Sequence, residues 1–194
     1  MKHSHEDLIG RLSGLLTRAG YRMATAESCT GGMIAALCTD VAGSSDWFTG
    51  GIVAYSNEIK KNVLGVPGAV IAAHGAVSGE VVRHMALGAL HVMGAEAVVA
   101  VSGVAGPGGG TELKPVGCVW SAVAVREKKG ACAVDLANLR RVFPDAIRLE
   151  AEDLSIVIAA IPHHFKGSRA EVREAAARET LRELALLLDA GGVG

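Results

Sequence analysis

Apolar residues recur along the chain with two periods, one typical of helices and one typical of strands. The first segment has the helical period and ends at a glycine: Leu8, Leu12, Leu15, Leu16, Ala19 and Gly20. The pattern then predicts a strand over 22–26, a turn over 27–32 and a helix over 33–40. A strand–turn–helix junction of this kind points backbone N–H groups at whatever lies above the end of the strand.

The middle of the chain continues to alternate strands with helices. We expect a strand over 48–56, a short helix over 57–64, a helix capped by Ser78 and a strand over 95–101. The last of these strands is continuously apolar, which is typical of a strand that is buried on both faces. A glycine-rich loop, 102–114, follows it.

Towards the C-terminus the pattern predicts a hairpin between 116–125 and 131–136, and a long helix over 169–188. Because we find no internal repeat and no low-complexity linker, we predict one domain over 1–194. The order of elements predicts a three-layer α/β/α sandwich with a mixed, mostly parallel central sheet. Ligands of such folds gather outside the carboxyl ends of the strands, so the loops after the first three strands should converge.

Composition narrows the classes of function. The formal net charge is −1, without the basic excess that direct nucleic-acid binding requires, so no such partner is expected. No apolar run reaches the roughly 18 residues of a membrane span, and the polar N-terminus does not resemble a signal peptide.

The cysteines and histidines do not predict a metal site. The cysteines form no CxxC pair and have no histidine at zinc spacing, which is typical of reduced thiols in a cytoplasmic protein: Cys29, Cys38, Cys118 and Cys132. Adjacent histidines on a strand point to opposite faces, which argues against a shared metal at His163 and His164, and His3 and His5 add no further ligand pattern.

Two short segments carry candidate chemistry, and each also has an ordinary structural explanation. Ser28 is either a simple helix cap or a nucleophile whose developing oxyanion is held by amide N–H groups. Cys29 is a rival nucleophile, although no histidine is predicted nearby to form its thiolate. Lys60 and Lys61 are either surface lysines or include one partly buried base with a lowered pKa, and their directions differ by about 100°, so only one can face the site.

The loop over 102–110 is the third candidate. Its glycines favour close approach of the backbone to a phosphate or a ribose, and a flexible connector would have the same composition. No Lys-Ser/Thr pair follows the last glycine, so the loop is not a P-loop.

The order of these segments along the chain resembles the CinA C-terminal family, which is the family of nicotinamide-nucleotide amidases also called PncC. The resemblance runs from about Leu8 to Val125. Six blocks carry it: Ala26–Gly32, Ala42–Phe48, Tyr55–Lys60, His74–Ser78, Ser102–Pro107 and Lys114–Gly117.

This resemblance implies a metal-free serine amidohydrolase that uses no cofactor and removes ammonia from nicotinamide mononucleotide. It implies Ser28 as nucleophile, Lys60 rather than Lys61 as base, and Tyr55 as an assisting hydroxyl. We expect the amides of Thr30–Gly32 to hold the oxyanion. The expected substrate-binding residues are Thr30, Gly31, Gly32, Asn57, Ser102, Gly103, Ala105, Gly106 and Arg169.

Arg169 is placed by a block, Phe165–Arg169, that stands where the family has Phe-x-Gly-Asp-Arg. Ser168 replaces the aspartate of that block, which changes the local ion pairing and keeps the cation. The segment over 137–164 is longer than the family usually carries and is expected to be an extra strand or helix, a lid, or a subunit contact.

Other expectations follow from the resemblance. Many family members carry a pyrophosphatase domain before this one; since Met1 lies just before the first predicted helix, we expect neither that domain nor its activity. We expect a cytoplasmic homodimer or larger homo-oligomer. The alternative functions are an amidase of the same mechanism acting on a different small amide, and a non-catalytic nucleotide-binding module associated with competence or DNA damage.

Overall fold

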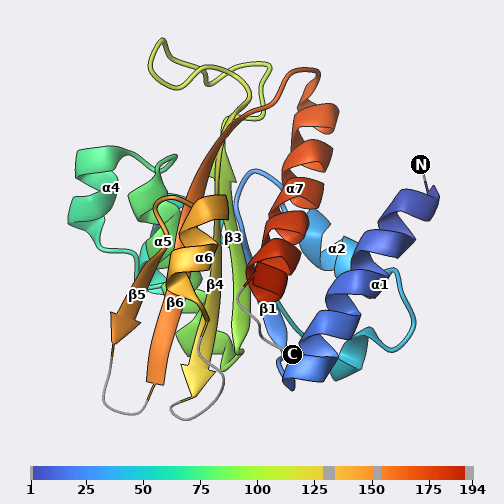
Figure 1. Cartoon of the computed structure of the whole chain (residues 1–194). Helices are drawn as coiled ribbons and strands as arrows, with labels where there is room; N and C mark the ends of the chain where they lie inside the picture. Colours follow the sequence, from blue (N-terminus) through green and yellow to red (C-terminus); the bar gives the residue numbers. More distant parts are fainter. Residues whose placement is uncertain (1, 129–133, 151–153, 191–194) are drawn as a thin grey trace.

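A computed structural model describes residues 2–128, 134–150 and 154–190. Its helices and strands follow the predicted alternation over most of the chain (Figure 1). In chain order they are α1 (Lys2–Ala19), β1 (Met23–Glu27), α2 (Met33–Thr39), the 3₁₀ turn η1 (Ser44–Asp46), β2 (Phe48–Val53), α3 (Asn57–Asn62), α4 (Gly68–His74), α5 (Gly79–Met93), β3 (Ala97–Gly103), β4 (Cys118–Lys128), α6 (Leu136–Val142), β5 (Ile147–Glu150), β6 (Leu154–His164) and α7 (Arg169–Ala190).

The strands form one mixed sheet in the order β2-β1-β3-β4-β6-β5. β1 is parallel to both β2 and β3, whereas β4 is antiparallel to β3 and to β6, and β5 is antiparallel to β6. β1, β2, β3 and β6 therefore run in one direction, and β4 and β5 run in the other. The predicted mixed sheet is confirmed; its parallel pairings are those of β1 with β2 and β3.

Helices cover both faces of this sheet, which gives the predicted three layers (Figure 1). On one face α1, α2 and α7 pack over side chains such as Met23 and Val99, and on the other α5 packs over side chains such as Ala24 and Val98. Alternate residues of a strand point to opposite faces, so β1 and β3 supply both cores. As predicted, β3 is buried on both faces.

The predicted hairpin between 116–125 and 131–136 is wrong where it can be checked. β4 pairs with β3 and β6, and Leu136 begins helix α6 instead of ending a strand. The cause is local: the Asp135 side chain accepts hydrogen bonds from the N–H groups of Ala137 and Asn138 and so caps a helix. Residues 131–133 lie outside the described residues. Helix α4 was not predicted.

The segment over 137–164 contains most of α6 and all of β5 and β6. β6 is an interior strand, paired along its length with β4 and, on its other side, with β5. Val157 and Ala159 are buried in the same core as α1 and α7. This part of the segment is therefore a structural strand of the sheet and not a lid.

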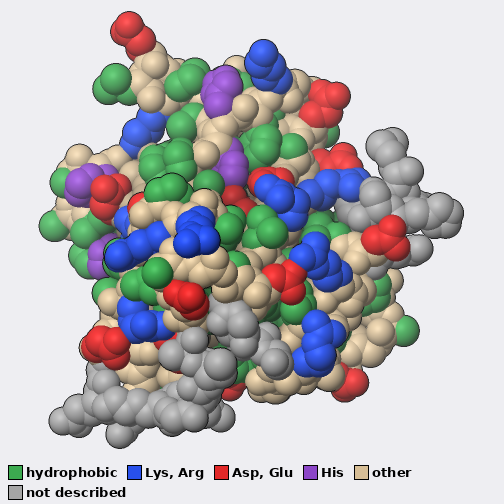
Figure 2. Space-filling view, in the orientation of Figure 1, with side chains coloured by type: hydrophobic (Ala, Val, Ile, Leu, Met, Phe, Trp, Pro, Cys, Tyr) green, Lys and Arg blue, Asp and Glu red, His purple; other side chains and the backbone are tan. Residues whose placement is uncertain are grey.

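Charged side chains are interspersed by sign over the face that carries α6 and α7 (Figure 2). No continuous basic patch covers the face in view, in keeping with the net charge of −1. Within the described part of the chain, no helix is both long and apolar enough to cross a membrane.

Gly88 lets α5 pack against the segment that follows α3. A Cβ at this position would lie 1.9 Å from the carbonyl oxygen of Leu64, a backbone atom that cannot move away alone. Gly88→Ala is therefore expected to destabilise the fold by about 1–3 kcal/mol through overpacking. Thermal unfolding measures this, and Gly10→Ala in α1 is the matched control because nothing lies within 4 Å of a Cβ there. An unchanged midpoint for Gly88→Ala would contradict the close packing.

Candidate functional site

Ser28 lies in the turn that follows the carboxyl end of strand β1. The Ser28 N–H donates to the Val101 carbonyl of β3 at 3.0 Å, so the residue is held to a neighbouring strand. Gly31 and Gly32 have φ angles of +61° and +95°, a region that favours glycine, and this explains the glycine pair after the serine. The turn is thus built to return the chain sharply from strand into α2.

Glu27 fixes the other end of this turn, a role that sequence reasoning missed. Its carboxylate is 1% exposed and accepts hydrogen bonds from the N–H groups of Gly32, Ile34 and Ala35 at 2.8–3.1 Å. The same carboxylate therefore satisfies amides at the start of α2 that have no partner within the helix. An acidic residue just before a glycine-rich helix start was the available signal.

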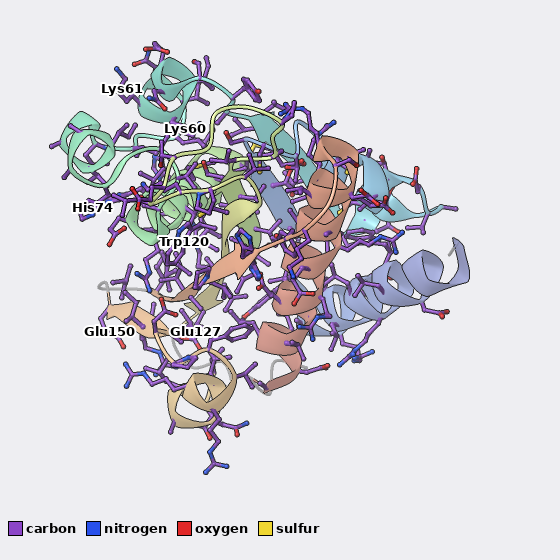
Figure 3. All side chains as sticks on the ribbon, turned by 90° about the horizontal axis from the view of Figure 1, so that it is seen from above. Lys60, Lys61, His74, Trp120, Glu127 and Glu150 are labelled. Carbon is purple, nitrogen blue, oxygen red and sulfur yellow. The ribbon has the colours of Figure 1, made fainter. Side chains whose placement is uncertain are left out.

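Lys60 reaches Ser28 from α3. Its side chain is only 1% exposed, and its Nζ lies 3.0 Å from the Ser28 Oγ. Ser56 begins the helix by accepting a hydrogen bond from the Ile59 N–H, and this sets which face turns inward. Figure 3 shows Lys61 on the outer side of the same helix, where it is exposed. Of the two lysines, Lys60 is thus the one that contacts Ser28.

The Lys60 amine has a buried environment that suits the neutral form. Burial lowers its pKa from the usual value of 10.5. Its Nζ donates to the carbonyls of Ala54 at 2.8 Å and Tyr55 at 3.1 Å. A neutral amine has two N–H donors, which these two carbonyls accept, so its lone pair is left for the Ser28 hydroxyl proton.

Two consecutive amides directly after Ser28 have the Cys29 sulphur, a weak acceptor, as their partner. Among the described residues, the N–H groups of Cys29 and Thr30 donate to no oxygen, although both residues are buried. By contrast the Gly31 N–H donates to the Ser28 carbonyl and the Gly32 N–H to Glu27. The expectation that Gly31 and Gly32 hold an oxyanion is therefore corrected, because their N–H groups are already used. Because sulphur is only a weak acceptor, both N–H groups stay available to a ligand oxygen.

Cys29 is not activated. Burial raises the pKa of its thiol to about 11, against smaller lowering effects of the nearby Cys29 and Thr30 N–H groups and of Arg173. The thiol thus keeps its proton at neutral pH, and its sulphur is only a weak acceptor for those N–H groups. Cys29, Cys38 and Cys118 are free thiols, and Cys132 lies outside the described residues.

The loops after β1, β2 and β3 converge on one cavity, as predicted. Its volume is about 200 Å³, and both Ser28 and Lys60 line it. The other lining residues are Cys29, Tyr55, Asn57, Ala76, Val77, Ser102, Gly103, Ala105 and Arg169. Thr30, Gly31 and Gly32 are not among them, and the buried Thr30 hydroxyl has no hydrogen-bond partner among the described residues.

Ser102 and the loop after α4 form one wall of this cavity. The Ser102 hydroxyl donates to the Ala76 carbonyl at 2.8 Å. Its proton is therefore used, and towards a ligand it can only accept. The contribution of Ala76 and Val77 was missed, although the block His74–Ser78 had been noticed as part of the resemblance.

Arg169 and Tyr55 lie at the rim. The guanidinium donates to the Gly106 carbonyl at 2.7 Å and to the Tyr55 hydroxyl at 3.4 Å. Within 2–128, 134–150 and 154–190, no carboxylate forms an ion pair with Arg169. The Tyr55 side chain is 63% exposed and is tied to Arg169. The rim therefore presents an arginine charge to a ligand.

The exchange of aspartate for serine at position 168 is absorbed locally. The Ser168 N–H donates to the Glu171 carboxylate at 2.8 Å, and the Glu171 N–H donates to the Ser168 Oγ at 3.4 Å. This reciprocal pair is a capping box at the start of α7. Arg169 is thereby kept at the rim despite the substitution.

Ser121, His163 and Glu183 form a cluster with the residue types of a hydrolase triad. The cluster lies inside the fold, away from the cavity that Ser28 lines. The Ser121 Oγ donates to Glu183 at 2.6 Å and lies 3.0 Å from the His163 Nε2. Ser121 is fully buried in β4, so a substrate cannot reach it. The cluster joins β4 and β6 to α7. His164 is exposed while His163 faces this cluster, so the two histidines do point apart.

Comparison with known proteins identifies the family of this chain. The family model described as the CinA C-terminal domain matches residues 5–156. The chain belongs to the CinA C-terminal domain family. The resemblance inferred from the six sequence blocks is thereby confirmed.

The CinA relatives fall into two sizes. A nicotinamide-nucleotide amidohydrolase PncC of Enterobacter agglomerans is 44% identical over 81% of this chain and 94% of its own length. That of Escherichia coli K12 is 48% identical over 70% of this chain and 81% of its own. A CinA-like protein of Citrifermentans bemidjiense is 50% identical over 70% of this chain, and the match spans 32% of that longer protein. The match thus spans about a third of the length of such a CinA-like relative.

Solved structures of CinA proteins share the fold. A CinA superfamily protein from Klebsiella pneumoniae is 31% identical with a TM-score of 0.76, covering 95% of this chain and 98% of that one. A competence/damage-inducible protein from Agrobacterium tumefaciens is 34% identical with a TM-score of 0.76, covering 94% of each chain.

Proposed function

We propose that this chain is a serine amidohydrolase that converts nicotinamide mononucleotide to nicotinic acid mononucleotide and ammonia. The observation that carries the proposal is the 3.0 Å separation of the Ser28 Oγ and the buried Lys60 Nζ at the wall of a cavity. The PncC relatives, whose names give the same activity, support the choice of substrate.

In the first step the neutral Lys60 amine takes the Ser28 hydroxyl proton while the Oγ attacks the carboxamide carbon. The carbonyl oxygen of the substrate becomes an oxyanion. The N–H groups of Cys29 and Thr30, which donate to no oxygen among the described residues, are the donors proposed to stabilise it. The carbonyls of Ala54 and Tyr55 stabilise the ammonium that Lys60 has become.

In the second step the tetrahedral intermediate collapses and the Lys60 ammonium gives a proton to the leaving ammonia. The Tyr55 hydroxyl is proposed to assist this transfer. Ser102, which can only accept towards the cavity, suits the N–H groups of a primary amide. Water then hydrolyses the acyl-enzyme with Lys60 again as base, and Ser28 is regenerated. No cofactor and no metal takes part in the proposed steps.

The substrate phosphate is proposed to bind Arg169, with Asn57 and the 102–106 loop around the ribose. Arginine binds phosphate through paired N–H donors, and this one has no carboxylate partner within the described residues. The free thiols of the described cysteines support a cytoplasmic location for the enzyme. A homodimer or larger assembly remains our expectation.

Arg169→Gln is expected to raise the KM for nicotinamide mononucleotide about tenfold, because an exposed charge-assisted hydrogen bond is lost. Turnover of nicotinamide riboside, which lacks the phosphate, should be unchanged. Steady-state kinetics with both substrates measures this, and Arg182→Gln, on the exposed face of the same helix, is the control. Equal losses on both substrates would contradict phosphate binding by Arg169.

The deciding experiment is ammonia release by the purified protein in the presence of a chelator. Nicotinamide mononucleotide is compared with nicotinamide riboside, nicotinamide and a panel of small primary amides. Ammonia release from another amide alone would favour an amidase that acts on a different small amide. Ammonia release from none of the compounds would overturn the enzyme proposal and leave the non-catalytic nucleotide-binding module.

A further inference from the structure

Arg173 lies one helical turn after Arg169 on α7 and has a different task. Residues four apart share a face of a helix, so both side chains extend towards the turn over 27–32 that carries Ser28. Arg169 ends at the rim of the cavity, where it donates to Gly106. Arg173 does not line the cavity and is half-buried behind the turn that carries Ser28.

The Arg173 guanidinium holds two consecutive carbonyls. Its Nε donates to the Cys29 carbonyl at 3.1 Å, and its Nη2 donates to the Thr30 carbonyl at 2.7 Å. A Cβ at Gly31 would lie 3.5 Å from the same Nη2, so the group packs closely against the turn. One planar guanidinium thus bridges two consecutive peptides and holds them in a fixed orientation relative to each other.

That bridge determines where the Thr30 N–H points. The Cys29 carbonyl and the Thr30 N–H belong to one planar trans peptide, so they point in opposite directions. With the carbonyl held on the α7 side, the N–H is turned away from α7. It is one of the two buried N–H groups that donate to no oxygen in the described parts of the chain.

We propose that Arg173 is a positioning residue that holds the Thr30 N–H where the oxyanion of the substrate forms. The inference rests on the amidase function proposed above. At the end of the turn near α2, the Glu27 carboxylate accepts a hydrogen bond from the Gly32 N–H. Closer to Ser28, Arg173 donates to the Thr30 carbonyl. The donor is thus preorganised before the charge develops, which is what stabilises a transition state more than a ground state.

The kinetic test is Arg173→Met, which removes both bridging donors and keeps an unbranched apolar stem. We expect kcat to fall at least about tenfold while KM changes by less than about threefold, because the lost contact acts in the transition state. Arg173→Lys keeps the positive charge but loses the forked pair of N–H donors, so its kcat should lie between those of the wild type and Arg173→Met. Arg178→Met removes a surface arginine that pairs with Glu174 on the same helix, and should match the wild type.

A second readout separates positioning from simple stabilisation of the fold. Pyridine-3-boronic acid forms a tetrahedral adduct in which the Ser28 Oγ bonds to boron, the hydroxyl proton passes to Lys60 and a boronate oxygen takes the place of the oxyanion. Arg173→Met should weaken this probe at least about tenfold and leave the binding of nicotinic acid mononucleotide unchanged. A lower unfolding midpoint with unchanged kcat and unchanged boronate binding would overturn the proposal.

The outcomes also separate this inference from the amidase proposal. A wild-type protein that binds the boronate at Ser28 without hydrolysing nicotinamide mononucleotide overturns the proposed substrate, and the boronate comparison still tests Arg173. A wild-type protein that does neither overturns both. Should Arg173→Met fail to fold, Arg173→Lys decides: wild-type kcat in that variant counts against the bridge.

Discussion

Ser28→Ala is expected to abolish deamidation, with a loss of about 10⁴-fold or more in kcat. The variant removes the atom that would form the acyl-enzyme and changes little else, because the fixed contact of this residue with β3 is made by its N–H. Removal of the Oγ leaves only binding and the oxyanion donors, which alone give weak catalysis. Ammonia release from nicotinamide mononucleotide under single-turnover conditions measures the loss.

Cys29→Ala is the matched control for this prediction. The thiol lies next to Ser28 and lines the same cavity, but its pKa is raised to about 11 by burial, so it should carry no chemistry. We expect the variant to keep wild-type turnover within a few-fold. Activity that survives in Ser28→Ala and disappears in Cys29→Ala would transfer the role of nucleophile to the thiol. Circular dichroism confirms that each variant is folded.

Much of the fold could be predicted because the pattern of apolar residues carries it. The apolar run that became β3 is buried on both faces, and the Ser78-capped helix became α5 with its apolar side on the sheet. The prediction failed where a single capping side chain outweighed the strand-like pattern. Asp135 starts α6 at a place where residue hydrophobicity alone favoured a second hairpin strand.

The sequence brought Ser28 and Lys60 forward as candidates, but it could not predict the contacts between the candidate residues. Ser28 and Lys60 were identified from motif order, and one hydrogen-bond distance now joins them. Oxyanion donors were predicted at Thr30–Gly32, and only the folded turn reveals that the N–H groups of Gly31 and Gly32 are already used. Spacing shows that a helix start offers several amides, and it does not show which of them remain available to a ligand.

Arg173 was missed for a related reason. Its contacts to Cys29 and Thr30 join residues that lie 144 and 143 positions apart, and no local pattern predicts such a pair. The one local signal was its position four residues after Arg169. The two arginines lie on one face of α7, Arg169 at the rim of the cavity and Arg173 behind the turn that carries Ser28.

Lys60→Met is expected to lower kcat/KM by about 10²- to 10⁴-fold, the usual cost of losing a general base. Methionine fills most of the buried space and cannot accept the Ser28 proton. The wild-type rate should also depend on pH with a defined sign. Burial lowers the Lys60 pKa below 10.5, and the base is the neutral amine, so kcat/KM should rise with pH through that lowered pKa and then level off.

Steady-state rates of ammonia release across the alkaline range measure this profile for the wild type, Lys60→Met and Lys61→Met. Lys61 is exposed on the outer side of α3, so its variant should keep both the rate and the rise with pH. Lys60→Met should lose the rise together with the rate, because the titrating group is gone. A flat wild-type profile, with the chemical step shown to limit turnover, would contradict a lysine base. The short Nζ–Oγ contact would then be structural, since a protonated Lys60 can still donate to the Ser28 hydroxyl and to both carbonyls.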